Sequence, residues 1–72
     1  MIMLLFNAKA GCKAQIKTVS GNDKICNFLF SLGCSEGEEI TLISVLAGNY
    51  IINIKDSRYA IDKKMAKSIE LM

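Results

Sequence analysis

The sequence contains no histidine, no tryptophan and no proline, and Arg58 is its only arginine. Without histidine, the chain lacks the most common general base of enzymes and the most common nitrogen ligand for zinc. A single arginine and a net charge of +2 also argue against a dedicated nucleic-acid binder, which is usually more basic and has clustered arginines. Catalysis, a zinc site and specific nucleic-acid recognition are therefore weak starting hypotheses.

Cysteine is scarce and odd in number, with Cys12, Cys26 and Cys34 as the only thiols. An odd set does not match the even disulfide framework of a small secreted domain. A closed zinc site typically has four nitrogen or sulfur ligands, often as closely spaced cysteine pairs, and this sequence has neither. We expect three reduced thiols, two of them half-buried, and neither a structural metal nor a cofactor.

Long apolar runs are absent. Residues 1–6 are apolar, but this segment is too short for a signal peptide and has no basic start. No run approaches the ~20 apolar residues of a membrane span. These features favour a soluble cytoplasmic protein that does not insert directly into the membrane.

Apolar residues make up 51% of the 72 residues, which is enough for a hydrophobic core and argues against disorder. This length predicts a single domain over residues 1–72. A chain this short buries only ~60% of its surface, so a deep active-site cavity is difficult to build. The best acid–base candidates, Glu38 and Glu39, are expected on opposite faces of a strand, and we therefore predict no catalytic residues and no enzyme.

Five glycines divide the chain into short segments, a pattern that suits a small barrel. Alternation and β-branched content predict strands at 12–20, 39–46, 50–55, 58–61 and 69–71. In the first of these, Ala14, Ile16 and Thr18 should share the buried face, with a bend or bulge near Thr18. One helical turn is expected at 63–67, capped by Asp62.

The clearest helix is predicted at 24–32. Asn22 or Asp23 can cap its start, and Gly33 follows where a left-handed residue would end it. Apolar residues recur at helical spacing and form one stripe that should face the core: Ile25, Phe28, Leu29 and Leu32.

Several of these segments together resemble the FeoA domain. The helix 24–33 ends in Leu-Gly, the turn 34–37 ends in Gly, and the strand 39–43 follows, in the order found in that family. Gly11 with the strand 14–16 is similar to the start of the domain, and 58–69 is similar to its end. The resemblance covers residues 4–71. It departs from the family pattern in the helix, which lacks the usual arginines, and at Glu36, where a proline is common.

The resemblance implies a mainly β fold, a small SH3-like β-barrel of about five strands with one inserted helix. It further implies a small cytoplasmic accessory protein of bacterial ferrous iron uptake that acts by protein–protein interaction. The implied partner is the cytoplasmic part of the FeoB membrane permease, which carries a G-protein domain. The same module ends some metal-dependent transcriptional repressors, where it serves as an interaction domain.

Cys26 and Phe30 are the best candidates for a partner-binding patch, since they lie one turn apart and outside the predicted core stripe. Phe6, Met1 and Met3 could extend an apolar surface that meets a partner or a second copy of the chain. The alternative is that Phe30 packs beneath the segment 1–6 and closes the barrel.

A basic cluster follows at Lys63, Lys64 and Lys67. It is either a solvated face or a second contact for an acidic protein surface, the inner membrane face or RNA. A small-barrel nucleic-acid-binding module remains an alternative function, with Tyr50 and Tyr59 as the only aromatic residues on which bases could stack. A transition-metal-binding module is the other alternative.

Overall fold

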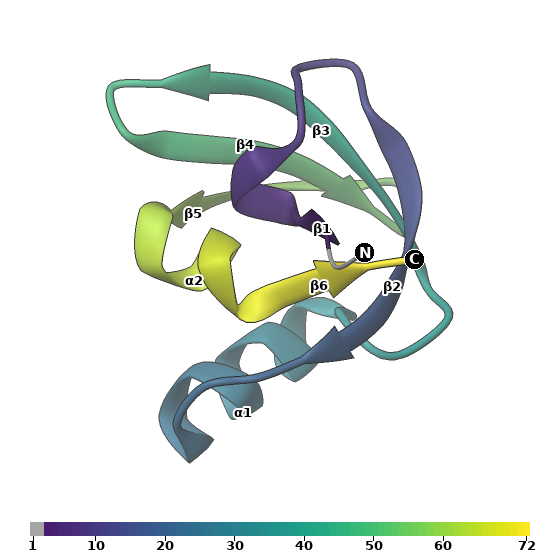
Figure 1. The fold of residues 1–72 in the computed structure, drawn as a ribbon, viewed down its shortest axis with the longest axis vertical. Coiled ribbons are helices and arrows are strands. Elements are labelled where there is room, and N and C mark those ends of the chain that lie inside the picture. Colours follow the sequence, from purple (N-terminus) through teal and green to yellow (C-terminus); the bar gives the residue numbers. More distant parts are fainter. Residues whose placement is uncertain (1–2) are drawn as a thin grey trace.

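The structure, a computed structural model, describes residues 3–72 (Figure 1). It contains six strands, two α-helices and one short 3₁₀ helix. In chain order these are β1 (Met3–Leu4), η1 (Leu5–Asn7), β2 (Lys13–Val19), α1 (Asp23–Leu32), β3 (Glu39–Leu46), β4 (Asn49–Ile54), β5 (Ser57–Asp62), α2 (Lys63–Ser68) and β6 (Ile69–Leu71). The predicted strands, main helix and short helical turn are all present. β1 was not expected, because two residues carry no readable alternation.

All strand pairs are antiparallel, and the strands follow the order β1-β6-β2-β3-β4-β5. β2 belongs to both halves of this curved sheet, because it pairs with β3 near its start and with β6 near its end. The register shifts in β2 between Ile16 and Thr18, and in β3 between Leu42 and Ser44. The predicted irregularity near Thr18 is therefore confirmed, and such irregularities help a sheet to bend.

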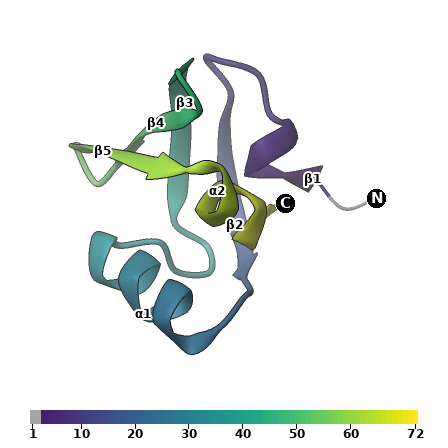
Figure 2. The same cartoon turned by 90° about the vertical axis from the view of Figure 1, so that its left-hand side faces the viewer.

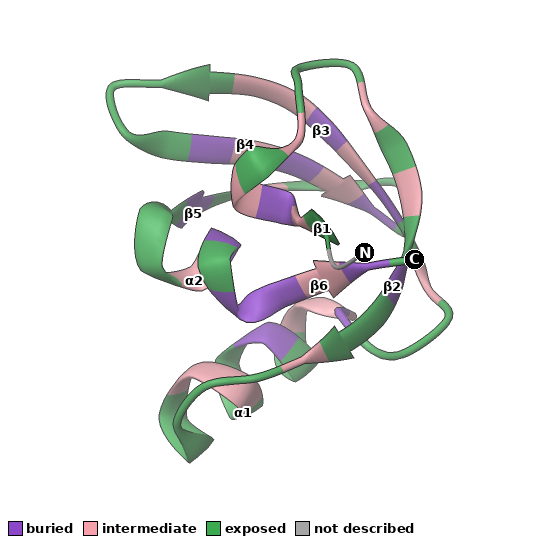
Figure 3. Cartoon of the chain, viewed as in Figure 1, coloured by how far each residue is buried: buried purple, intermediate pink, exposed green. Residues whose placement is uncertain are grey.

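Figures 1 and 2 show where the helices lie relative to the sheet. α1 lies along one end of the molecule, and α2 lies between α1 and η1 in both views. The bend of the sheet and these helices enclose one core, which is drawn in purple in Figure 3. Its largest fully buried side chains come from nearly every element: Leu5, Ile16, Leu29, Ile40, Leu42, Ile52, Ile54, Ile61 and Ile69.

Local sequence explains both ends of α1. The Asn22 carboxamide accepts a hydrogen bond from the Ile25 N–H at 2.9 Å, which confirms the predicted cap. Gly33 ends the helix with φ 102°, and its N–H donates to the Leu29 and Phe30 carbonyls. A Cβ at this position would also lie only 3.3 Å from Ile54 Cγ2. The predicted Asp62 cap of α2 is likewise present, since its side chain accepts from the Met65 N–H.

Two predictions about the core were wrong. Phe28 was assigned to the core stripe of α1 but is 43% exposed, because only the side of the helix that carries Leu29, Ile25 and Leu32 packs against the core. Thr18 was assigned to the buried face of β2 but is exposed, whereas Val19 packs against the core. The bulge before Thr18 reverses the alternation that the prediction assumed.

None of the helices in residues 3–72 has the length and apolar character needed to cross a membrane.

Candidate partner-binding surface

Phe30 lies on the exterior of α1, as the partner-binding hypothesis required. Its side chain is 51% exposed, while the preceding Leu29 is completely buried. The alternative that Phe30 packs beneath the N-terminal segment is wrong for the described residues, and the part of it that involves Met1 lies outside them. An exposed aromatic side chain on a rigid helix has the character of an interface anchor.

Cys26 is half-buried and only borders this surface. Its thiol is oriented toward the junction between β2 and α1, where Sγ lies 3.9 Å from the Val19 carbonyl oxygen and 3.8 Å from that of Gly21. Cys26 and Phe30 share one side of α1, but the thiol is engaged with backbone carbonyls. Phe30 is therefore the stronger contact candidate of the pair.

Phe28, Val45 and Leu46 are also exposed apolar side chains, and the sequence did not indicate that they would be exposed. Phe28 lies on the opposite flank of Leu29, because residues one position apart are separated by about 100° around a helix. Val45 and Leu46 are 45% and 62% exposed where β3 ends at its hairpin. No periodic signal distinguishes them, because β3 carries apolar residues on both faces. Met3, which was named as a possible extension of the patch, is 38% exposed.

The basic cluster lies on α2, whereas Phe30 lies on α1. Lys63 Nζ and Lys67 Nζ lie 5.6 Å and 4.8 Å from the centroid of the Phe6 ring in η1, which favours a cation–π interaction. Lys64 is exposed. In Figure 2 η1 lies on the side of α2 away from α1, so Lys63 and Lys67 are directed to the side of α2 that faces η1.

The Phe6 ring also packs against Tyr50, with 6.0 Å between the ring centroids. Tyr50 is only 7% exposed, and its hydroxyl lies 3.5 Å from the Phe6 carbonyl oxygen. The hypothesis that Tyr50 stacks on a nucleic-acid base is therefore wrong, because its ring faces are covered by the protein. Tyr59 is half-buried. This removes most of the aromatic platform on which the nucleic-acid alternative depended.

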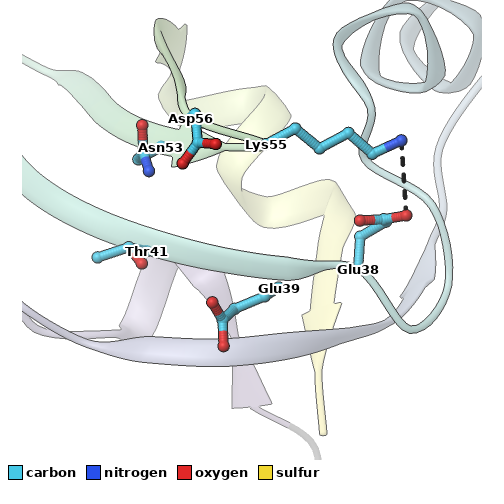
Figure 4. A pocket seen from close by; sticks show the side chains of 6 residues that line it. All are labelled: Glu38, Glu39, Thr41, Asn53, Lys55 and Asp56. Carbon is cyan, nitrogen blue, oxygen red and sulfur yellow. Dashed lines mark ion pairs between the residues drawn. The ribbon is translucent and has the colours of Figure 1, made fainter.

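A shallow polar cavity of about 180 Å³ lies between the start of β3 and the β4–β5 turn (Figure 4). Its lining includes both Glu38 and Glu39, but their carboxylates are directed away from each other, as the sequence predicted (Figure 4). Each carboxylate is matched by a lysine, Glu38 by Lys55 at 3.6 Å and Glu39 by Lys13 at 3.5 Å.

The three cysteines are all free thiols in the structure. Cys12 and Cys26 are half-buried, as predicted, and Cys34 is completely buried. Burial raises the pKa of the Cys34 thiol to about 11. Across residues 3–72, no three side chains of the metal-binding types lie close enough to hold an ion.

Comparisons with known proteins agree with this fold. A crystal structure described as an iron uptake regulatory protein (FeoA) is 25% identical and has a TM-score of 0.90, over 100% of this chain and 96% of that chain. FeoA of Stenotrophomonas maltophilia, described as a prokaryotic SH3 domain protein complexed with zinc, is 22% identical with a TM-score of 0.86 over 97% of this chain and 89% of that chain.

A manganese-dependent transcriptional repressor shares the fold at 15% identity and a TM-score of 0.90, over 99% of this chain but only 41% of that chain. No curated protein matches the sequence. The SH3-like architecture predicted from the sequence is confirmed by the S. maltophilia comparison. The sequence model of the FeoA domain matches residues 3–72, nearly the whole chain, and the chain belongs to the FeoA domain family.

Proposed function

We propose that this protein is a cytoplasmic accessory factor of bacterial ferrous iron uptake that binds the cytoplasmic part of a FeoB-type permease and catalyses no reaction itself. Membership of the FeoA family supports the link to iron transport. The S. maltophilia relative is described as a candidate activating factor for that process. The observation that carries the binding role is Phe30, an aromatic side chain left 51% exposed beside a fully buried neighbour.

In this proposal Phe30 is the apolar anchor, with Cys26 at its border. Anchors of this kind supply much of the binding energy at protein interfaces. Lys63, Lys64 and Lys67 provide a second contact that attracts an acidic surface of the permease. Such charges act mainly on the association rate and lose influence as salt increases.

Binding of the full-length chain to the cytoplasmic domain of the FeoB permease from the same genome tests this proposal. Phe30→Ala should weaken binding by ~1–3 kcal/mol, while the melting temperature falls far less than for Leu29→Ala. Leu46→Ala is the matched control, since it removes a similarly exposed apolar side chain from a different surface. Its affinity should equal that of the wild type.

Changing all three lysines of α2 to glutamine should slow association and flatten its salt dependence. Absence of binding by the wild-type protein would contradict the accessory role. Binding that Phe30→Ala leaves unchanged would instead exclude Phe30 as the anchor and direct attention to the lysines of α2.

A further inference from the structure

β5 lies at the edge of the sheet, and the backbone groups on the side facing away from β4 form a regular, unpaired row in the described part of the chain. In the described part of the chain it pairs only with β4, in a ladder of six consecutive residue pairs without a bulge. None of the turn, loop or cap backbone hydrogen bonds of residues 3–72 involves Ser57 to Ile61. Proteins usually protect such edges with proline, a bulge or charged side chains. β5 has no proline and no bulge, and its two charged residues, Arg58 and Asp62, are of opposite sign.

The β4–β5 turn determines which backbone groups point outward. Lys55 and Asp56 form a two-residue turn with φ 51° and 65°, so Ile54 and Ser57 are the hydrogen-bonded pair that closes the hairpin. The pattern then alternates along β5. Tyr59 and Ile61 direct their N–H and C=O groups toward β4, whereas Arg58 and Ala60 direct theirs away from the sheet.

The side chains along this edge are suited to close approach. Arg58, Ala60 and Asp62 are all exposed on one face of β5, and the small Ala60 lies at the centre. Neither Arg58 nor Asp62 belongs to an ion pair within residues 3–72. Asp62 uses one carboxylate oxygen to cap α2, which leaves its second oxygen available.

We propose that β5 pairs antiparallel with β5 of a second copy of this chain, about a two-fold axis through Ala60. This register places Arg58 of each copy directly opposite Asp62 of the other, so one symmetric interface contains the same ion pair twice. Ala60 of each copy exchanges both backbone hydrogen bonds with its counterpart. Tyr59 then lies opposite Ile61 on the other face of the joined sheet, where Ile61 is already buried in the core of its own copy.

Charge selects this register over its neighbours. A two-fold axis through Arg58 or through Asp62 would place like charges directly opposite each other. A two-fold axis through Tyr59 would place Asp56 of each copy opposite Asp62 of the other, again a pair of like charges. Only the axis through Ala60 both satisfies the outward backbone groups at the centre and pairs opposite charges.

The proposal is tested by exchanging the charges of Arg58 and Asp62 and measuring the dimer dissociation constant of each variant. Sedimentation velocity across a concentration series gives this constant. Arg58→Asp and Asp62→Arg should each raise the dimer dissociation constant about tenfold or more, because each variant places like charges opposite each other. An equimolar mixture of the two variants should regain the dimer, since position 58 of each copy then again faces a position 62 of opposite charge. Lys9→Asp, with the same change of charge at an exposed site away from β5, should associate as the wild type does.

Loss of the Asp62 cap could unfold α2, so circular dichroism accompanies each variant, and Ala60→Pro gives an independent test. Proline removes an outward N–H without touching the β4 ladder, and it should abolish the dimer in a folded protein. In a mixed-isotope sample of the wild type, an intermolecular contact between the α-protons of Tyr59 and Ile61 would establish the register. A wild type that is monomeric at about 1 mM, or a dimer insensitive to these variants, would overturn the proposal.

Discussion

Leu29 and Phe30 are consecutive residues of α1 in opposite environments. Leu29 is fully buried at the centre of the core, and Phe30 is 51% exposed. The helix therefore commits one side chain to folding and leaves its larger neighbour accessible for contact with a partner. This separation allows stability and binding to be tested by different substitutions in the same turn.

Leu29→Ala should destabilise the protein by ~2–5 kcal/mol, because it leaves a cavity among side chains that cannot fully collapse into it. Phe30→Ala should destabilise by less than about 1 kcal/mol, as is usual for a surface substitution. Chemical denaturation of both variants measures the two values. Similar losses for the two variants would contradict the orientation of α1.

The β4–β5 turn offers a site for stabilisation. Lys55 and Asp56 both adopt positive φ, which Asn-Gly tolerates much better. The double variant Lys55→Asn, Asp56→Gly should gain about 1 kcal/mol in free energy of unfolding. Glu38→Gln is the control, because it breaks the Lys55–Glu38 ion pair without altering the turn. A loss of stability in the double variant beyond that of the control would show that the turn is not strained.

Cys34 should make stability depend on alkaline pH. Its folded pKa of about 11 is above the ordinary value of 9.0, so the unfolded chain releases this proton first. The contribution is fully present below pH 9 and is lost as the pH rises toward 11, by about 2–3 kcal/mol in total. Lysines and tyrosines titrate in the same range, so the measurement is the difference between the wild type and Cys34→Ala. A difference that stays constant from pH 8 to 11 would contradict a shifted thiol.

Protein purified without added metal should contain no tightly held zinc or iron. The three thiols come from separate segments, and no cluster of three candidate ligands occurs among residues 3–72. Elemental analysis provides the measurement, with a zinc-loaded and dialysed sample as the comparison. One equivalent of retained metal per chain would refute this prediction and favour the metal-binding alternative.

The sequence by itself determined the local features of this protein. Asn22, Gly33 and Asp62 were identified as helix ends because capping depends on a few adjacent residues and their own backbone angles. The positions of the longer strands and the burial of Leu29 followed from periodicity. The order of these segments was also sufficient to indicate the FeoA domain, whose sequence model matches residues 3–72.

Only the tertiary structure decided how much of each helix or strand is buried and which distant segments pack against each other. Periodicity grouped Phe28 with Leu29 but did not show that the core covers too narrow a strip of α1 to bury both side chains. Tyr50 became a core residue because Phe6, 44 positions away in the chain, packs against its ring. The free edge of β5 has the same origin. Whether a strand has one neighbour or two depends on the order of strands in the sheet, which is a property of long-range pairing and not of the six residues themselves.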